Sequence, residues 1–480
     1  MNKVIKSSSL LIFQRLMQRS LGIVSTIILA RLLTPDDFGI VAIAMLVLWF
    51  SQTLSDASTE AFILQQKKVR KIDLNSAWTL DLILKSCAYM FMLALAPHVA
   101  QIKNLPELTA VISVTGLLIV LESLKNPIFM IYKRRQKYEA IIKLTIYAKV
   151  ISLFISIPIA LIYKSYWAVI LAAIFAEIFL AISSYKISNY RPKLSIEKIS
   201  AQWNFSKWLI PRSIIGYFRN HLDTLLVSNA YTNAELGAYN NLKYFASIPM
   251  LQFLAPLIEP LHTELGKVSD NKGEIRYQSD LTIRALSIIG SIIIGFLYVN
   301  SELIIRIVLG EQWTQYSTMF SLFSLLTIPF IFINQSFRIL MIENRTNYIF
   351  IYEAISTILI ALFLVTAINF SIENFIIVKV LVESILSVAL YCYTYKTTFE
   401  LHPALNVTAF FLFTGAAILL TKWASESFVF SQITIIELAA NVFISALIFV
   451  VFFLIFYNTL ISERERNLIK VLAKSMVRNS

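Results

Sequence analysis

The chain has 480 residues, of which 57% are hydrophobic and only 15% are charged. Its mean hydropathy is +0.70. In an ordinary soluble domain, by contrast, roughly 25% of the residues are charged. This composition excludes a soluble enzyme, a secreted disulfide scaffold and a disordered chain, because too few polar residues are present to cover soluble domains. A multi-pass membrane protein remains. The chain has 42 Lys and Arg residues but only 29 Asp and Glu residues, and this basic surplus is first to be explained by the membrane setting.

Apolar runs of about 20 residues, long enough to cross the hydrocarbon core, predict an all-α integral membrane protein with about fourteen transmembrane helices. The runs do not alternate polar with apolar residues, as the strands of a membrane barrel do. In chain order, the predicted helices span roughly residues 10–32, 37–55, 75–96, 108–132, 144–163, 166–187, 208–231, 239–262, 282–308, 316–341, 347–370, 375–395, 405–423 and 435–461.

The distribution of basic residues orients these helices. With the N-terminus inside, the cytoplasmic segments hold 27 of the 42 Lys and Arg residues and the opposite side holds five. The positive-inside rule therefore places both termini in the cytoplasm. The cluster formed by Lys67, Lys68, Arg70 and Lys71 is basic enough to suggest nucleic acid, but a topology signal that also contacts anionic lipid explains it better.

No cofactor and no metal site are expected. Cys87 and Cys392 each lie in an apolar run, which is typical of small buried side chains, and the four histidines are scattered along the chain. The chain has only 11 glycines and no phosphate-binding Gly-rich motif. All predicted loops are short, so we expect neither a soluble domain nor a nucleotide-driven pump.

One short motif occurs twice, at an offset of 198 residues. Residues 29–39 align without gaps with residues 227–237. In each copy a Thr precedes an acid by three residues, which predicts a capping box at the start of the next helix. The repeated residues are Thr34, Asp37 and Gly39 in the first copy and Thr232, Glu235 and Gly237 in the second.

Both copies face the same side of the membrane, so they predict two halves related by a pseudo-two-fold axis along the membrane normal. We expect two six-helix lobes and two extra C-terminal helices. The predicted segments are an N-terminal lobe (1–190), a cytoplasmic linker (191–207), a C-terminal lobe (208–397), the two extra helices (398–461) and a basic cytoplasmic tail (462–480).

Four motifs lie at the repeat or follow it in the chain: Ile28-Leu-Ala-Arg-Leu-Leu-Thr-Pro-Asp-Asp-Phe-Gly39, Asn220-His-Leu-Asp-Thr-Leu-Leu226, Leu236-Gly-Ala-Tyr-Asn240 and Leu309-Gly-Glu-Gln-Trp313. With these motifs the sequence resembles the Wzx-type polysaccharide biosynthesis proteins, the lipid-linked oligosaccharide flippases, whose superfamily includes the MurJ flippases and the MATE exporters. The resemblance covers about residues 8–345. It implies a V-shaped pair of lobes around a central cavity that opens alternately to each side, in a bacterial inner membrane.

Charges within predicted spans are candidate functional groups, because an ionisable group costs several kcal/mol near the bilayer centre. The pairs Asp81 with Lys85 and Lys379 with Glu383 have the i,i+4 spacing of ion pairs within one helix.

Two helices carry polar stripes whose arginines are not all neutralised in this way, although Arg219 has the i,i+4 spacing to pair with Asp223. Arg15, Gln18 and Arg19 lie on one face of the first helix, and Arg212 and Arg219 on one face of the seventh. Two interpretations of these stripes remain open. The arginines line a cation-rich cavity, where they grip the diphosphate of a lipid-linked sugar, or they form salt bridges between the lobes. For the glycan, Gln52, Tyr217 and Tyr244 are candidate contacts.

Three functions compete. The first is a flippase that moves an undecaprenyl-diphosphate-linked oligosaccharide to the outer leaflet, with membrane lipids, a polysaccharide polymerase and chain-length machinery as candidate partners and a monomer as the expected state. The second is a MATE-like exporter, for which Glu60, Asp223 and Glu259 are candidate coupling acids. The third is a membrane glycosyltransferase or polymerase that uses Asp36 and Asp37 as catalytic acids. Such enzymes typically need long outer loops, which this sequence lacks, and the capping box already explains Asp37. We therefore expect a transporter and not an enzyme.

Overall fold

The computed structural model describes residues 2–56, 58–207, 209–255, 271–400, 403–427, 440–444 and 447, with side chains from Met17 onward. Glu259, most of the predicted helix 435–461 and the predicted tail 462–480 lie outside the described residues. The described part is helical, without strands. Its first half contains α1 (Asn2–Leu32), α2 (Pro35–Ser55), α3 (Thr59–Gln65), α4 (Lys71–Lys103), α5 (Glu107–Ser123), α6 (Ile128–Arg134), α7 (Glu139–Tyr163), α8 (Trp167–Ser184), α9 (Ile199–Ser206) and α10 (Leu209–Ala230).

The second half is also helical. Its elements are α11 (Asn233–Pro249), the π-helical turn η1 (Met250–Leu254), α13 (Lys272–Val299), α14 (Ser301–Val308), the 3-10 turn η2 (Glu311–Tyr316), α15 (Ser317–Ser324), α16 (Thr327–Ile342), α17 (Thr346–Ala367), α18 (Ile372–Phe399) and α19 (Ala404–Ser427). Within the described ranges, nine segments are long and apolar enough to cross a membrane, and the bent pair α5 and α6 makes a tenth. The protein is an all-α, multi-pass membrane protein.

Each of the first thirteen predicted spans coincides with one or more of these helices, but several spans are broken. The predicted span 108–132 is two helices, α5 and α6, bent by 62°. The break falls before Pro127, because a proline disfavours helical backbone at the residue that precedes it, and the Asn126 side chain accepts a bond from the Ile128 amide at 3.0 Å. The predicted spans 282–308 and 316–341 are likewise divided, at Asn300 and at Leu325–Leu326.

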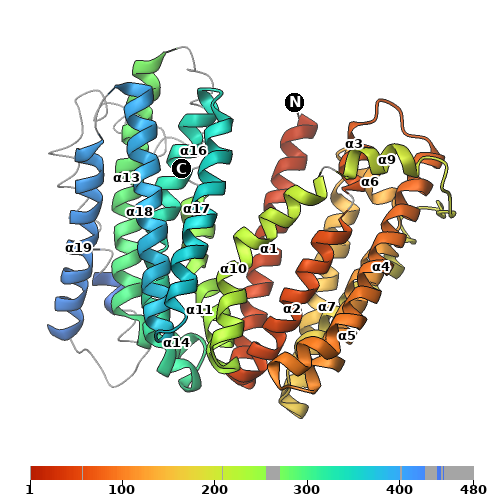
Figure 1. Ribbon diagram of the computed structural model, residues 1–480, viewed down its shortest axis with the longest axis horizontal. Helices are drawn as coiled ribbons and strands as arrows, with labels where there is room; N and C mark the ends of the chain where they lie inside the picture. Colours follow the sequence, from red (N-terminus) through yellow and green to blue (C-terminus); the bar gives the residue numbers. More distant parts are fainter. Residues whose placement is uncertain are drawn as a thin grey trace. The chain divides into compact units, whose positions relative to one another are not determined.

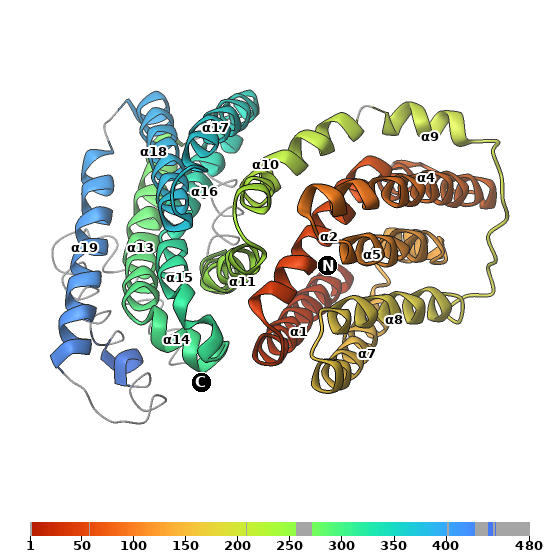
Figure 2. The same ribbon diagram turned by 60° about the horizontal axis from the view of Figure 1, so that its bottom comes forward.

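The chain divides into two compact units after Asn240. Unit 1 holds α1 to α10 and the first turns of α11. In Figures 1 and 2, α4 and α5 lie side by side, as do α7 and α8. The first helix of the predicted C-terminal lobe, α10, packs on α2 within unit 1. The boundaries of the lobes given by the repeat stay a prediction.

Unit 2 is built around α13, α16 and α18, with α17 against α18 and α19 against α13. Its core includes Phe332, Tyr391 and Phe410. The first of the two extra helices, α19, is held on α13 by polar contacts as well as packing, since Asn406 donates to Asp280 at 2.8 Å and Ser291 bonds Thr414 at 2.9 Å.

Candidate functional site

The repeated motif forms two capping boxes with the same geometry. In the first, the Thr34 amide and hydroxyl donate to Asp37 Oδ2 at 2.9 and 2.7 Å, and the Asp37 amide donates back at 3.3 Å. In the second, Thr232 donates to Glu235 Oε2 at 2.9 and 2.7 Å, and the Glu235 amide donates back at 3.2 Å. The predicted boxes are confirmed, and they set the starts of α2 and α11.

The glycines of the motif bring these two helix starts into backbone contact. A Cβ atom on Gly39 would lie 2.0 Å from the Asn233 carbonyl oxygen, and one on Gly237 would lie 2.0 Å from the Pro35 carbonyl oxygen. Pro35 and Asn233 are equivalent residues of the repeat, so each copy presses its glycine on the first helical residue of the other. We call these four residues the glycine joint.

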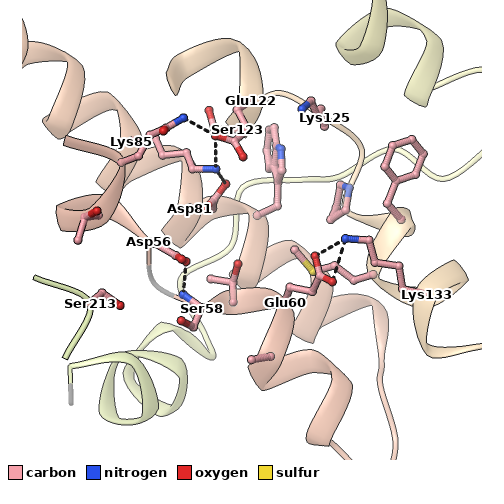
Figure 3. A pocket seen from close by; sticks show the side chains of 18 of the residues that line it. Asp56, Ser58, Glu60, Asp81, Lys85, Glu122, Ser123, Lys125, Lys133 and Ser213 are labelled. Atoms are coloured by element: carbon pink, nitrogen blue, oxygen red, sulfur yellow. Dashed lines mark hydrogen bonds and ion pairs between the residues drawn. The ribbon is translucent and has the colours of Figure 1, made fainter. Parts of the chain in front are cut away.

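Unit 1 contains a cavity of about 1080 Å³. Its walls come from the long helices α2, α4, α5, α7, α8 and α10 and from the short helices α3 and α6. Figure 3 shows the charged part of its wall, where side chains from different helices point toward one another. Four acids and three lysines line the cavity: Asp56, Glu60, Asp81, Glu122, Lys85, Lys125 and Lys133.

Three of these charges form a triad across two helices. Lys85 Nζ lies 3.1 Å from Asp81 Oδ2, which confirms the predicted pair on α4, and 3.5 Å from Glu122 Oε2 on α5. The side chains of Lys85 and Asp81 are only 12% and 18% exposed, whereas that of Glu122 is 41% exposed. Gln52 on α2 donates to Glu122 at 3.5 Å. Together with Gln52, the triad joins α2, α4 and α5 at the cavity wall. Figure 3 labels its three charged members.

The other two lysines of the wall are also paired. Lys133 Nζ lies 2.7 Å from Glu60 Oε2, and Lys125 Nζ lies 2.7 Å from Glu177 Oε2. Because every lysine of the wall faces a carboxylate, this cavity offers donors and acceptors without a strong surplus of either charge. The coupling candidate Glu60 is one member of such a pair.

Aromatic rings make another part of the wall. The Trp49 ring stacks on His221 at 4.9 Å, and His221 lies 4.9 Å from the Tyr217 ring. Tyr217 is fixed, since its hydroxyl donates to the Leu46 carbonyl at 3.0 Å. Gln52 and Tyr217, which were singled out in the sequence, line this cavity, whereas Tyr244 belongs to unit 2. Their contact with a glycan stays a prediction.

The arginines predicted to bind substrate lie on α1 and α10. Arg19, Arg212 and Arg219 are exposed and Gln18 is half-buried, whereas the Arg15 side chain is outside the described part. Arg212 and Arg219 each stand next to a residue that lines the cavity, Ser213 and Asn220, but are not themselves part of its wall as described. Their role in binding a diphosphate stays a prediction.

A further lysine lies near the polar stripe of α1. The helix packs on α7, and the Lys149 side chain passes 3.9 Å from the position of a Cβ on Gly22. The Thr26 hydroxyl, one turn further along α1, donates to the Gly22 carbonyl at 2.9 Å.

The second coupling candidate, Asp223, is buried on α10. Its carboxylate accepts bonds from the Tyr239 hydroxyl at 2.7 Å and from the Thr224 amide at 2.9 Å. The bond from Tyr239 ties α10 to the first turns of α11. The third candidate, Glu259, is outside the described residues.

One buried charge was missed in the sequence. Arg338 on α16 is fully buried, and its guanidinium nitrogens have no hydrogen-bond partner among the described residues. Arg338 lies within the predicted span 316–341, but so near its end that it was grouped with the basic residues of the loop that follows. Counting every Arg inside a span as a candidate would have found it.

The chain matches a known protein family. The model of the polysaccharide biosynthesis protein family matches residues 28–318, more than half of the chain. Lipopolysaccharide biosynthesis protein WzxC of Escherichia coli (strain K12) is 21% identical over 357 residues, which are 71% of this chain and 70% of that protein. Succinoglycan biosynthesis transport protein ExoT of Rhizobium meliloti (strain 1021) is 23% identical over 297 residues, which are 61% of this chain and 60% of that protein.

Solved structures agree on the fold. The lipid II flippase MurJ, in an inward closed conformation, gives a TM-score of 0.74 at 14% identity and covers 95% of this chain and 100% of its own. An inward-facing multidrug resistance transporter of the MATE family gives a TM-score of 0.56 at 10% identity, covering 80% of this chain and 95% of its own. These likenesses confirm the resemblance drawn from the sequence motifs, and the chain belongs to the polysaccharide biosynthesis protein family, with the fold shared by MurJ and the MATE transporters.

Proposed function

We propose that this protein flips an undecaprenyl-diphosphate-linked oligosaccharide from the cytoplasmic to the outer leaflet of a bacterial inner membrane, for the synthesis of a surface polysaccharide. One observation carries the proposal. A chain of the polysaccharide biosynthesis family follows the fold of a lipid II flippase along 95% of its length. Both termini lie in the cytoplasm, and the protein works by alternating access as a monomer.

The cavity of unit 1 suits the glycan part of such a substrate. Its volume of about 1080 Å³ slightly exceeds the roughly 300–1,000 Å³ of pockets for drug-sized ligands. Aromatic faces, amides and paired charges supply stacking surfaces and hydrogen bonds for sugar hydroxyls. Since the charges are paired, the wall attracts a neutral glycan without holding it tightly, which favours release on the other side.

The lipid-linked diphosphate needs positive groups elsewhere. Arg15, Arg19, Arg212 and Arg219, with Gln18, are the residues we assign to it, because a guanidinium binds two phosphate oxygens at once and keeps its charge. Glu60, Asp223 and Glu259 stay candidate acids for coupling to an ion gradient. A polysaccharide polymerase and chain-length machinery are the partners that would use the flipped substrate.

Deletion of the gene tests this function against its two competitors. A flippase defect removes the surface polysaccharide and leaves full-length lipid-linked oligosaccharide in the cell, measured by mass spectrometry of extracted lipids. A glycosyltransferase or polymerase defect changes the length of that oligosaccharide instead. An exporter defect changes drug sensitivity and leaves the surface polysaccharide normal. Either of the last two results refutes the proposal.

A further inference from the structure

The linker between α8 and α9 is an extended strap tied to the beginning of α4. Three of its backbone amides donate to polar side chains on the early turns of that helix. The bonds are Lys193 N to Asn75 Oδ1 (3.1 Å), Ser195 N to Thr79 Oγ1 (2.9 Å) and Lys198 N to Ser76 Oγ (3.2 Å). The strap, residues 190–198, therefore has a fixed place on unit 1 although it has no regular secondary structure.

Both ends of the strap are also held. At its first residue, the Tyr190 hydroxyl donates to Asn75 Oδ1, and burial raises the pKa of this tyrosine to about 12, so that it stays a donor. After it, Gln202 on α9 donates to the Asp73 carbonyl at 3.1 Å, and Phe205 packs against Phe62 at 5.7 Å. The strap and α9 thus form one surface on the side of α4.

The bonds determine which side chains of the strap face outward. Ser195 faces α4, since its hydroxyl lies 3.4 Å from that of Ser76. Side chains alternate along an extended chain, so Leu194 and Ile196 point away from the protein and are 72% and 76% exposed. On α9, Trp203 is 41% exposed. Three large apolar side chains therefore project from a segment outside the transmembrane helices.

This surface is also strongly basic. Residues 186–207 contain five basic residues and one acid, Glu197. All five basic residues are exposed: Lys186, Arg191, Lys193, Lys198 and Lys207. The combination of outward apolar side chains and a cationic rim is typical of segments that lie in the interface of a membrane with anionic lipids. Tryptophan is enriched at the same depth.

The position of the strap along α4 also agrees with a place in the membrane interface. The anchoring residues Asn75 and Thr79 are the fifth and ninth residues of α4, so at 1.5 Å per residue they lie about 6 and 12 Å from its first residue. Since α4 begins with the charged residues Lys71 and Asp73, we place its first turn at the membrane surface. The strap then lies near the boundary between headgroups and acyl chains.

We propose that the strap and α9 form a docking surface for anionic phospholipid headgroups of the cytoplasmic leaflet, with Leu194 and Ile196 inserted among the upper acyl carbons. The cations bind lipid phosphates and the apolar side chains fix the depth. The strap carries the chain from α8 to α10, so lipid bound there also holds the segment that joins the two halves of the repeat. This inference does not depend on the nature of the transported substrate.

An environment-sensitive fluorophore on Leu194→Cys tests the proposal, in full-length protein with Cys87→Ser and Cys392→Ser. The strap is anchored through backbone amides, so this substitution leaves the anchoring bonds intact. The protein is reconstituted in nanodiscs of phosphatidylcholine, with or without phosphatidylglycerol. We expect a blue shift of emission, with quenching by spin-labelled lipid, that is larger in phosphatidylglycerol and decreases as salt screens the charges.

Two charge variants identify the origin of the shift. Lys193→Gln with Lys198→Gln should remove most of the dependence on phosphatidylglycerol. Lys137→Gln with Lys143→Gln is the matched control, because these exposed lysines lie on the same predicted side, outside the strap, and the same charge is lost. Emission typical of water in both membranes refutes insertion, and an equal shift in both membranes refutes the recognition of anionic lipid. A shift lost equally in both double variants also contradicts the proposal, since it would reflect net charge and not the strap.

Discussion

Replacement of Gly39 with alanine tests the glycine joint between the two repeated motifs. The added methyl would lie 2.0 Å from the Asn233 carbonyl oxygen, whereas ordinary contacts begin at 3.4 Å and real Cβ atoms essentially never approach within 3.0 Å. The starts of α2 and α11 would therefore have to separate by about 1.0–1.4 Å. Backbone and not a flexible side chain blocks the methyl, so no rotamer change relieves the contact.

Overpacking of this kind costs typically 1–3 kcal/mol, and the backbone contact places the expected loss at about 3 kcal/mol. For a unit of 240 residues, such a loss lowers Tm by roughly 6–12 °C. Gly237→Ala should have a similar effect, because its methyl would lie 2.0 Å from the Pro35 carbonyl oxygen. The double variant should lose less than the sum, since the first methyl already opens the joint.

Thermal unfolding of the purified protein in detergent measures these losses, with surface polysaccharide measured in cells. Gly415→Ala on α19 is the matched control, because a Cβ there meets nothing within 4 Å, and alanine favours a helix over glycine by about 1 kcal/mol. A Tm of Gly39→Ala equal to that of Gly415→Ala would refute the close backbone contact.

Three further substitutions test individual charges. Lys85→Met leaves the Asp81 carboxylate buried without its partner, which costs about 3–5 kcal/mol, so Tm should fall. Adding Asp81→Leu should restore most of the lost Tm, because the remaining acid, Glu122, is 41% exposed and stays hydrated. A double variant as unstable as the single one argues against the triad. Arg19→Ala should abolish most surface polysaccharide at an unchanged protein level, whereas Arg31→Ala near the C-terminal end of the same helix should not. Normal polysaccharide in Arg19→Ala refutes the assignment of Arg19 to the diphosphate. Arg338→Met removes a buried charge that has no partner among the described residues, so Tm should rise. A lower Tm would contradict this expectation, because it would mean that the guanidinium stabilises the fold.

Local patterns in the sequence were enough to predict the helices and their caps. Runs of apolar residues depend only on neighbours in the chain, and the starts of α2 and α11 follow from a Thr and an acid three residues apart. The pair Asp81 and Lys85 was predictable for the same reason, because i,i+4 residues adjoin on a helix whatever surrounds them.

Features that depend on distant residues or on short elements were missed. Nothing in the local sequence places Glu122 of α5 beside Lys85, or presses Gly39 on Asn233, since those contacts arise only when the helices pack. A window of about 20 residues also passes over α3 and α9, which have 7 and 8 residues. The sequence of the strap does not show which of its side chains point outward, because that depends on its bonds to α4.

A flipping assay with purified protein tests the central claim most directly. Liposomes containing a fluorescent lipid-linked oligosaccharide are prepared with and without the protein, and a glycosidase that cannot cross the membrane is added outside. We predict that the protein makes the inner-leaflet pool accessible, so that nearly all of the oligosaccharide is cleaved, while liposomes without protein keep that pool intact. An inner-leaflet pool that remains protected in the presence of folded protein would contradict the assignment as a flippase.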